Sequence, residues 1–477
     1  MTASHIALSR FGYGLKFGEE PPRDAKRYLL SQIDNFEPKP VQIAGRPDTT
    51  ELAGKFVDVI HARNRARTIA QDRAESMGMD RTRVKVSLEE YLPQFPAEVR
   101  GTYLEPIKAL IRDLGFRFDM AAASDTPMME RLVHFWSNHF SVTARKIGTY
   151  HQVGNLEFGA IRPKVRGKFG DMMKAAVLHP AMLFYLDQFR SIGPNSPRKR
   201  GPGRRGLNEN LAREILELHT LGVNGGYSQE DVTEFARALT GWTIGGLRQT
   251  SRFAPEGARG TIFIDAFHEP GARTIMGKTY RQQGSEQALA VLDDLATHPS
   301  TARFVSTKLA RHFAGDVPPE SLVRRLERNF LRTGGDLESL TRTLIEAPEC
   351  WREGPVKFQR PFEWLVASLR FAGGDQFNER QIYSMLVALG EQSWNAPSPA
   401  GFDDFEGNWA GPDALIRRVE LAERITRRAP FAANILDRAK AAFPGTLSEN
   451  TRLWLSRAES DRQALGLMLA APEMMRR

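Results

Sequence analysis

Two carboxylates lie beside the predicted buried face of one helix. In the segment NENLAREILELHTL, a rotation of ~100° per residue places Asn210, Glu214 and Glu217 on one stripe, next to an apolar stripe of leucine and isoleucine. A carboxylate in that position is partly desolvated and needs a cation, a hydrogen-bond donor or a metal. Arg213 is four residues from both Glu209 and Glu217 and can supply the cation. An ion-pair network and a functional site therefore both fit this helix.

A second segment, MMERLVHFWSNHF, places an acid, an imidazole and an amide beside an aromatic stripe. Glu130, His134 and Asn138 recur every fourth residue and stack on one helical face. His139 is rotated from His134 by ~140°, so this helix cannot direct two imidazoles at one metal. A divalent metal is possible if one imidazole here joins carboxylates from another helix. The candidate ligands are His134, Glu214 and Glu217.

Two further places combine histidine with an acid. His179 precedes Pro180 where a helix is expected to begin, and Asp187 comes late in that helix, PAMLFYLDQF. A carboxylate there opposes the helix dipole and favours a nearby cation. His268 and Glu269 fall at a predicted hairpin turn, HEPG, where exposed turn residues are the simpler interpretation.

A basic loop precedes the glutamate-bearing helix. The range 191–206 contains several arginines and no acid. Its GPGRRG stretch lacks the Gly-x-x-x-x-Gly-Lys spacing of a phosphate-binding loop and follows no predicted strand, and the range lacks aromatic residues for base stacking. A solvated loop is the simpler interpretation, although Arg204 and Arg205 could close over an anionic substrate.

The composition is that of a globular protein with a substantial core. Of 477 residues, 41% are hydrophobic, and no run approaches the ~20 apolar residues that cross a bilayer. The net charge of +9 admits an anionic partner, but 66 basic residues are interspersed with 57 acidic ones. Nucleic acid is not favoured, because no nucleic-acid-binding motif is present. A single cysteine and the lack of a signal peptide predict a cytoplasmic protein.

Hydrophobic periodicity predicts a mainly α protein, with one large multi-helix domain. We expect an N-terminal segment with a polar helical arm at 1–100 and a helical core domain at 101–477. A small β-hairpin is predicted near 261–280, and an irregular loop rich in Pro, Gly and Trp near 390–412. Ser228 and Asp231 form a predicted capping box.

Several segments resemble one bacterial family. These are RFGYG, HFWSNHF, HPAMLFYLDQ, NENLAREILELHTLGVNGGYSQEDVTEFARALTGWT, HPSTARFVSTKLARHF, RPFEWLVASLR and GEQSWNAPSPAGFDDFEGNW. Together they resemble the domain-of-unknown-function 1800 family over most of the chain. The resemblance implies a mainly helical fold, but no established reaction and no catalytic residues. Relatives often carry an export signal and are often encoded beside a sulfatase/alkaline-phosphatase-like protein, which implies such a partner.

Two hypotheses follow. In the first, the chain is a hydrolase or transferase acting on a polysaccharide or a phosphorylated, anionic substrate, with its site between the helices at 130–140 and 208–219. The candidate catalytic residues are His134, Glu214, Glu217 and Asp187. The candidate substrate-binding residues are Asn138, Asn210, Arg213, Arg204 and Arg205. In the second, a non-catalytic protein uses the basic loop at 198–205 to bind an acidic polymer or a partner protein.

Overall fold

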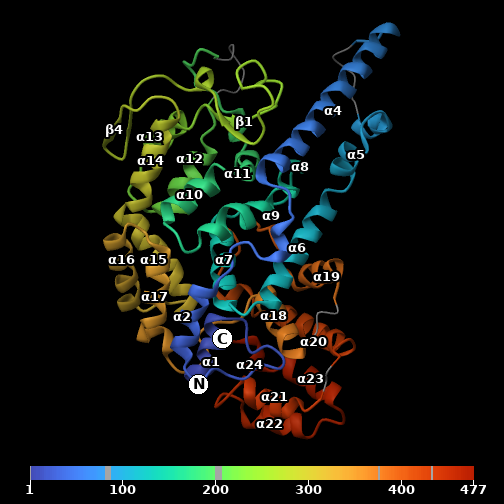
Figure 1. The fold of residues 1–477 in the computed structure, drawn as a ribbon, viewed down its shortest axis with the longest axis vertical. Coiled ribbons are helices and arrows are strands. Elements are labelled where there is room, and N and C mark those ends of the chain that lie inside the picture. Colours follow the sequence, from blue (N-terminus) through green and yellow to red (C-terminus); the bar gives the residue numbers. More distant parts are fainter. Residues whose placement is uncertain (1, 81–86, 199–206, 374–376, 431–432) are drawn as a thin grey trace.

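Helices form almost all of the regular structure, and one hydrophobic core runs through them (Figure 1). The computed structural model describes residues 2–80, 87–198, 207–373, 377–430 and 433–477. Its largest apolar cluster includes residues from Ile6 to Met475 and so joins the first helices to the last. The chain is a mainly helical single domain, as its sequence predicts.

The N-terminal part of the chain contributes both to the core and to a projecting arm. Helices α1 (Ala3–Ile6), α2 (Ala25–Asn35) and α3 (Val41–Ala44) bury apolar residues in the main core. The long helix α4 (Thr49–Ser76) extends away from the body, and α5 (Ala97–Leu104) lies beside it (Figure 1). A separate small cluster packs along α4. The sequence predicts this arm, and the boundary near residue 100 stays a prediction.

The middle of the chain builds the body from packed helices. They are α6 (Pro106–Ala123), α7 (Pro127–His139), α8 (Ile147–Tyr150), α9 (Val153–Asn155), α10 (Phe169–Val177), α11 (Pro180–Tyr185), α12 (Asn210–Glu214), α13 (Gln229–Ala238), α14 (Ser285–Thr297), α15 (Pro299–Ala314), α16 (Glu320–Thr333) and α17 (Leu337–Glu346). Proline occupies the first position of α6, α7, α11 and α15, where its missing N–H costs no hydrogen bond. The predicted capping box of Ser228 and Asp231 begins α13.

The C-terminal helices close the fold against the N-terminus. They are α18 (Pro361–Ala372), α19 (Glu379–Leu389), α20 (Pro412–Thr426), α21 (Ile435–Ala442), α22 (Glu449–Ser456), α23 (Asp461–Leu469) and α24 (Pro472–Met475). The Arg477 carbonyl accepts hydrogen bonds from the backbone of Val356 and Lys357, and its buried side chain donates to the Arg10 carbonyl. The two ends of the chain therefore lie close together (Figure 1).

The β structure differs from the single hairpin predicted across Glu-Pro-Gly. Strand β1 (Trp242–Ile244) pairs with β2 (Thr261–Phe263), and β3 (Arg273–Ile275) pairs with β4 (Lys278–Tyr280). The tight turn lies at Met276 and Gly277, which both adopt the positive φ that a two-residue hairpin turn requires. His268 and Glu269 are buried rather than exposed. The Glu269 carboxylate accepts two hydrogen bonds from Asn195, and Nδ1 of His268 lies 2.9 Å from the Thr240 carbonyl.

The late irregular loop lies where the sequence predicts it and is fixed by side chains of the body. The Asn138 side chain binds both backbone polar groups of Phe402, at 2.8 Å each. Gly401 precedes that contact with a positive φ, and a Cβ on it would lie 2.4 Å from the Asn138 carbonyl oxygen. The loop therefore needs glycine at this position in order to reach α7.

The single cysteine, Cys350, is buried in the core and follows α17. Burial raises the pKa of its thiol to about 12. The thiol therefore stays protonated at neutral pH, and this cysteine is a packing residue.

A buried ion pair ties α7 to the segment after it. The Arg162 guanidinium donates to both carboxylate oxygens of Glu130, at 2.6 and 2.7 Å, and both side chains are 2% exposed. The same guanidinium also donates to the carbonyls of Glu37 and Pro38. Glu130 therefore neutralises an arginine that joins the N-terminal segment to the body.

Replacing Glu130 by Gln leaves Arg162 charged and buried without its carboxylate. We expect the free energy of unfolding to fall by about 3–5 kcal/mol, the usual cost of removing one partner of a buried pair. Urea denaturation followed by circular dichroism measures the loss. The matched control is Asp437→Asn, which removes an exposed pair with Lys440 and should not change stability measurably. Equal losses in the two variants would contradict this account.

Candidate functional site

A pocket of about 900 Å³ lies between α6, α7, α15, α18 and the late loop. Its wall includes Tyr13 from the N-terminal segment and Trp409 from the late loop, so residues far apart in the sequence meet in it. Six arginine and lysine side chains and three carboxylates line it. Of the predicted site residues, His134 and Asn138 are part of this wall.

His134 is a neutral imidazole between a phenol and a carboxylate. Its Nδ1 lies 2.7 Å from the Tyr13 hydroxyl, and its Nε2 lies 3.9 Å from Oε1 of Glu157. Burial raises the pKa of Tyr13, so the hydroxyl keeps its proton and donates it to Nδ1. Burial and the neighbouring arginines, Arg117 foremost, hold the pKa of His134 well below its ordinary value. The hydrogen bonding therefore assigns the imidazole proton to Nε2, facing Glu157.

Glu157 is a functional candidate that the sequence does not indicate. It lies in a π-helical turn, η4 (Leu156–Ile161), of the kind often found at functional sites. Its buried carboxylate accepts a hydrogen bond from the Trp394 indole at 3.2 Å and lies 3.3 Å from Nε of Arg117. Burial raises the pKa of this carboxyl. A π-turn could not be predicted, because nothing in the segment NLEFGAI distinguishes it from an ordinary helix.

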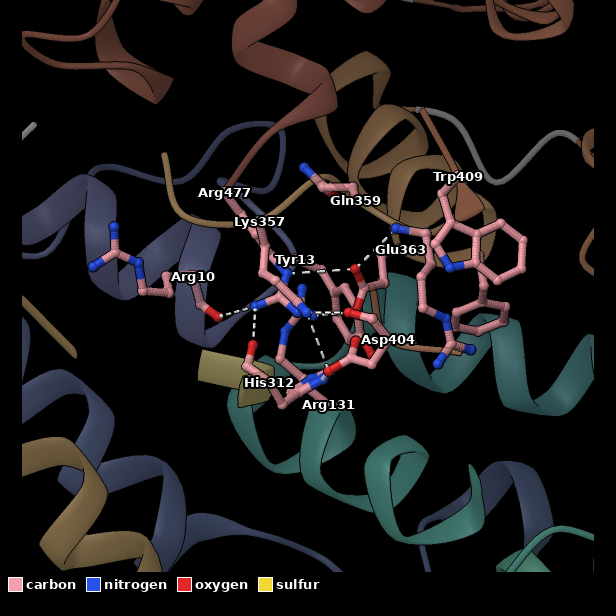
Figure 2. A network of polar contacts seen from close by, with 12 residues as sticks. Arg10, Tyr13, Arg131, His312, Lys357, Gln359, Glu363, Asp404, Trp409 and Arg477 are labelled. Carbon is pink, nitrogen blue, oxygen red and sulfur yellow. Dashed lines mark hydrogen bonds and ion pairs between the residues drawn. The ribbon is translucent and has the colours of Figure 1, made fainter. Parts of the chain in front are cut away.

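Glu363 anchors a buried charge network, which Figure 2 shows from close by. One carboxylate oxygen accepts from Arg131 at 2.5 Å, and the other lies 3.4 Å from Nε of Arg477. Burial opposes ionisation of Glu363, but the charges of Arg131 and Arg477 outweigh it and hold its pKa well below the usual range. The carboxylate therefore stays charged and interacts with the guanidinium groups of two arginines.

His312 and Asp404 form a histidine–carboxylate pair on the same wall (Figure 2). Nδ1 of His312 lies 3.1 Å from the Asp404 carboxylate, which also contacts Lys357. Burial lowers the pKa of His312 to about 4, so the imidazole is neutral at pH 7 and donates its Nδ1 proton. Nε2 is buried and has no hydrogen-bond partner among the described residues. This is the arrangement in which a carboxylate orients a histidine as a general base.

The cations of the pocket divide into two sets. Arg117, Arg131 and Arg360 form ion pairs with carboxylates behind the wall. A second set has no carboxylate partner within the part of the chain that the structure describes. Its members are Arg145, Lys308 and Arg311.

These three cations contact only neutral groups. Arg145 donates to the Asn395 side chain, Lys308 contacts Nδ1 of His139, and Arg311 donates weakly to a backbone carbonyl. Burial lowers the pKa of Lys308 to about 8. One exposed carboxylate of the pocket, Asp403, also lacks an ion pair among the described residues. The unpaired charge on the wall is therefore predominantly positive.

The glutamate-bearing helix does not contribute to this pocket. Glu214 and Glu217 are absent from its wall, and both lie half-buried at the junction of α12 with the π-turn η7 (Ile215–Thr220). Burial, and then the charge of Glu217, raises the pKa of Glu214 to about 7. The Tyr227 hydroxyl lies 3.4 Å from Glu217. Neither glutamate therefore lines the pocket that contains His134.

The remaining predicted residues have local partners or lie outside the described residues. Arg213 pairs with Glu209 rather than with Glu217, and Asn210 is exposed. Asp187 lies beyond the end of α11 and adopts a positive φ, so it is not late in that helix as expected, and it pairs with Lys146 at 2.8 Å. Arg204 and Arg205 lie outside the described residues. Within the described residues, no group of three or more His, Cys, Asp or Glu side chains is arranged to hold a metal ion.

Fold and pocket together define a mainly helical single-domain protein with a cation-rich polar pocket. The chain belongs to the family described as protein of unknown function (DUF1800), whose family model matches residues 6–476. This confirms the resemblance seen in the sequence. No curated protein and no solved structure matches the chain. Among the described residues, no helix is both long enough and apolar enough to span a membrane.

Buried neutral histidines predict that the protein loses stability in acid. Burial lowers the pKa of His179 to about 3, so between pH 6.5 and 3 the unfolded chain takes up a proton that the folded chain does not. Stability therefore falls as the pH falls, by up to about 1.4 kcal/mol per pH unit for this histidine. His179→Asn keeps a hydrogen-bond acceptor for the first turn of α11. The variant should lose less unfolding free energy per pH unit than the wild type, by up to the contribution of this one histidine. Urea denaturation at several pH values measures it.

The exposed residue His61 on α4 provides the control for this experiment. His61→Asn makes the same substitution at an exposed position, and the effect of His179→Asn is compared with it. A His179→Asn protein with an unchanged pH dependence would contradict the assignment of a buried neutral imidazole.

For Glu214 we expect the opposite effect of pH on the free energy of unfolding. Because its pKa is raised in the folded state, the stability it contributes when protonated is lost as the pH rises from about 4.5 through about 7. Glu214→Gln should therefore stabilise the protein at pH 8 by about 1–2 kcal/mol, allowing for solvent screening, and change little at pH 4.5. Thermal melting at both pH values tests this, with the exposed Glu230→Gln as control. A destabilised Glu214→Gln at pH 8 would instead indicate a partner for the carboxylate.

Proposed function

We propose that the chain is a hydrolase or transferase whose pocket binds a sugar that carries a phosphate or a carboxylate. The observation that carries the proposal is the set of three cations without carboxylate partners beside the His312–Asp404 pair. One set of residues can hold an anion, and the other can move a proton. The two occur in a single pocket of about 900 Å³, a size that suits a small ligand.

The unpaired cations support an anionic substrate. Desolvating a charge without a partner is costly, and the lowered pKa of Lys308 reflects that cost. An anionic group placed between Lys308 and Arg311 would remove it, and Arg311 could bind a phosphate or carboxylate with two parallel hydrogen bonds. Arg311 and Lys308 are one helical turn apart on α15, so one anion can contact both.

Aromatic rings support the sugar part of the substrate. Phe402, Phe405 and Trp409 line the pocket from the late loop, with the Phe402 and Trp409 rings 6.1 Å apart. Phe405 is also covered by the Arg311 guanidinium, at 4.5 Å. The C–H faces of a sugar ring pack against such rings, while its hydroxyls bind the neighbouring polar groups. The rings therefore suit a sugar better than a purely inorganic anion.

The neutral His312 supports acid–base chemistry. Its Nε2 carries a free lone pair, and the Asp404 carboxylate stabilises the imidazolium that forms when Nε2 accepts a proton. Lys357 in turn holds Asp404 in place. In this proposal His312 activates a water molecule or a hydroxyl group that attacks the substrate. His134, with its proton on the side of Glu157, is proposed to orient the substrate.

A non-catalytic binding protein remains the second candidate, because the unpaired cations of the pocket alone could retain an acidic polymer. The basic loop at 198–205, predicted for that role, lies outside the described residues except for Arg198. In that case His312 would serve only to hold the late loop through Asp404. The shared site first predicted for His134, Glu214 and Glu217 stays a prediction, as do a sulfatase/alkaline-phosphatase-like partner and a cytoplasmic location.

The experiment compares binding with turnover. Glucose 6-phosphate and glucuronic acid are titrated into the protein by calorimetry, and hydrolysis of 4-nitrophenyl phosphate and 4-nitrophenyl glycosides is assayed. Arg311→Gln should weaken binding about tenfold, which corresponds to one charge-assisted contact of about 1.4 kcal/mol. His312→Asn should lower turnover about 10²–10⁴-fold and leave binding within twofold.

Arg328→Gln, an exposed arginine on α16 outside the pocket, is the matched control and should change neither quantity. Circular dichroism establishes that each variant is folded. Binding that is lost in Arg311→Gln, without turnover of any compound by the wild type, would favour the binding protein. Binding that is unaffected by Arg311→Gln would reject this pocket as the anion site.

A further inference from the structure

A second hollow, of about 800 Å³, lies where the arm meets the body. One wall comes from α4, through Phe56, Val59 and Arg63 among others. The opposite wall comes from α8, α11 and η6 (Gln188–Arg190). Figure 1 shows α4 projecting from the body near α8. The pocket proposed above contributes no residue to it.

The mouth of this hollow carries arginines without acidic partners. Arg63 and Arg67 are one turn apart on α4, Arg190 faces them from the body, and all three are exposed. Within the described residues none of the three forms an ion pair with a carboxylate. The hollow therefore presents guanidinium groups whose hydrogen-bond donors are open to an anion.

Asp187, the one acid among the described residues that line the hollow, is already neutralised. Asp187 binds Nζ of Lys146 at 2.8 Å, and the same ammonium donates to the Tyr185 carbonyl at 2.8 Å. Lys146 and Asp187 thus cancel each other and leave the three arginines as the net charge. This pair also accounts for Asp187 without a catalytic role.

The floor of the hollow is aromatic and aliphatic. The rings of Phe56 and Phe184 pack edge to face with their centroids 4.4 Å apart. The rings of Phe184 and Phe189 pack in the same way with their centroids 5.1 Å apart. Ile60 and Tyr103 extend this surface. An apolar floor below a cationic mouth fits a flat ring that bears an anionic group, because each part of the ligand meets the surface that suits it.

We propose that this hollow binds a phosphorylated aromatic compound of nucleotide size, with its ring against Phe56 and its phosphate between Arg63, Arg67 and Arg190. One guanidinium group can bind two phosphate oxygens through two parallel hydrogen bonds. Two arginines one helical turn apart can contact the same phosphate. The ligand would join α4 to the body, so binding would fix the arm relative to the pocket. The proposal does not rest on the function proposed for that pocket.

Adenosine 5′-monophosphate is the probe, titrated into the full chain by calorimetry, with adenosine and inorganic phosphate titrated separately. We expect the monophosphate to bind at least tenfold more tightly than either part, because only it uses both surfaces. Arg63→Gln combined with Arg67→Gln should weaken it at least tenfold. The matched control is Arg65→Gln, an exposed arginine on the same helix that lines a different hollow, and it should leave the affinity within twofold.

Three outcomes would overturn the proposal. The first is no binding of the monophosphate to the folded wild type at millimolar concentration. The second is binding of the monophosphate that the double variant leaves unchanged. Weakening by Arg311→Gln as large as that by the double variant would also count against this hollow, because it would place the probe in the other pocket. The third is an adenylate oligonucleotide that binds at least 100-fold more tightly than the monophosphate, which would indicate an extended polyanion surface. Exposed arginines on α4 contribute little to stability, so each variant should melt at the temperature of the wild type. Melting curves check this and so exclude unfolding as the cause of weaker binding.

Discussion

The carboxylate of Glu363 is the charge on which the centre of the molecule depends. It lies near the start of α18 and binds Arg131 of α7 and Arg477 at the C-terminus. Arg477 continues the linkage, because its guanidinium donates to the carbonyls of Arg10 and His312. One buried negative charge thus fixes the N-terminal segment, α7, α15 and the chain end at the same point. This carboxylate offsets the cost of burying the two arginines, since an unpaired buried charge costs several kcal/mol.

This compensation also determines what the pocket can bind. Arg117, Arg131 and Arg360 are neutralised from behind and act as rigid walls, whereas the cations without carboxylate partners face the cavity. The late loop closes the site through hydrogen bonds between Asn138 and Phe402 and through the contacts of Asp404. The same architecture that stabilises the fold therefore leaves a defined excess of positive charge at one place.

Much of the fold could be predicted from the sequence, because helical periodicity, capping residues and turn glycines are local signals. A smaller part of the candidate site could be predicted for the same reason: His134 and Asn138, which share a helical stripe, both line the pocket. The rest depends on contacts between distant segments. Glu157 comes from a π-turn with no sequence signature, and His312 and Asp404 are 92 positions apart. Glu214 and Glu217 show the converse, since their spacing is suggestive but neither side chain lines the pocket.

The buried state of Cys350 has a practical consequence for spectroscopy. With its thiol protonated and enclosed by the core, the natural protein presents no reactive thiolate to alkylating reagents. A cysteine introduced on the exposed face of α4 or on the late loop would then be the one position that takes a fluorophore or a spin label, without a cysteine-free background. Distances between the arm, the loop and the body could be followed in solution in an otherwise unaltered chain.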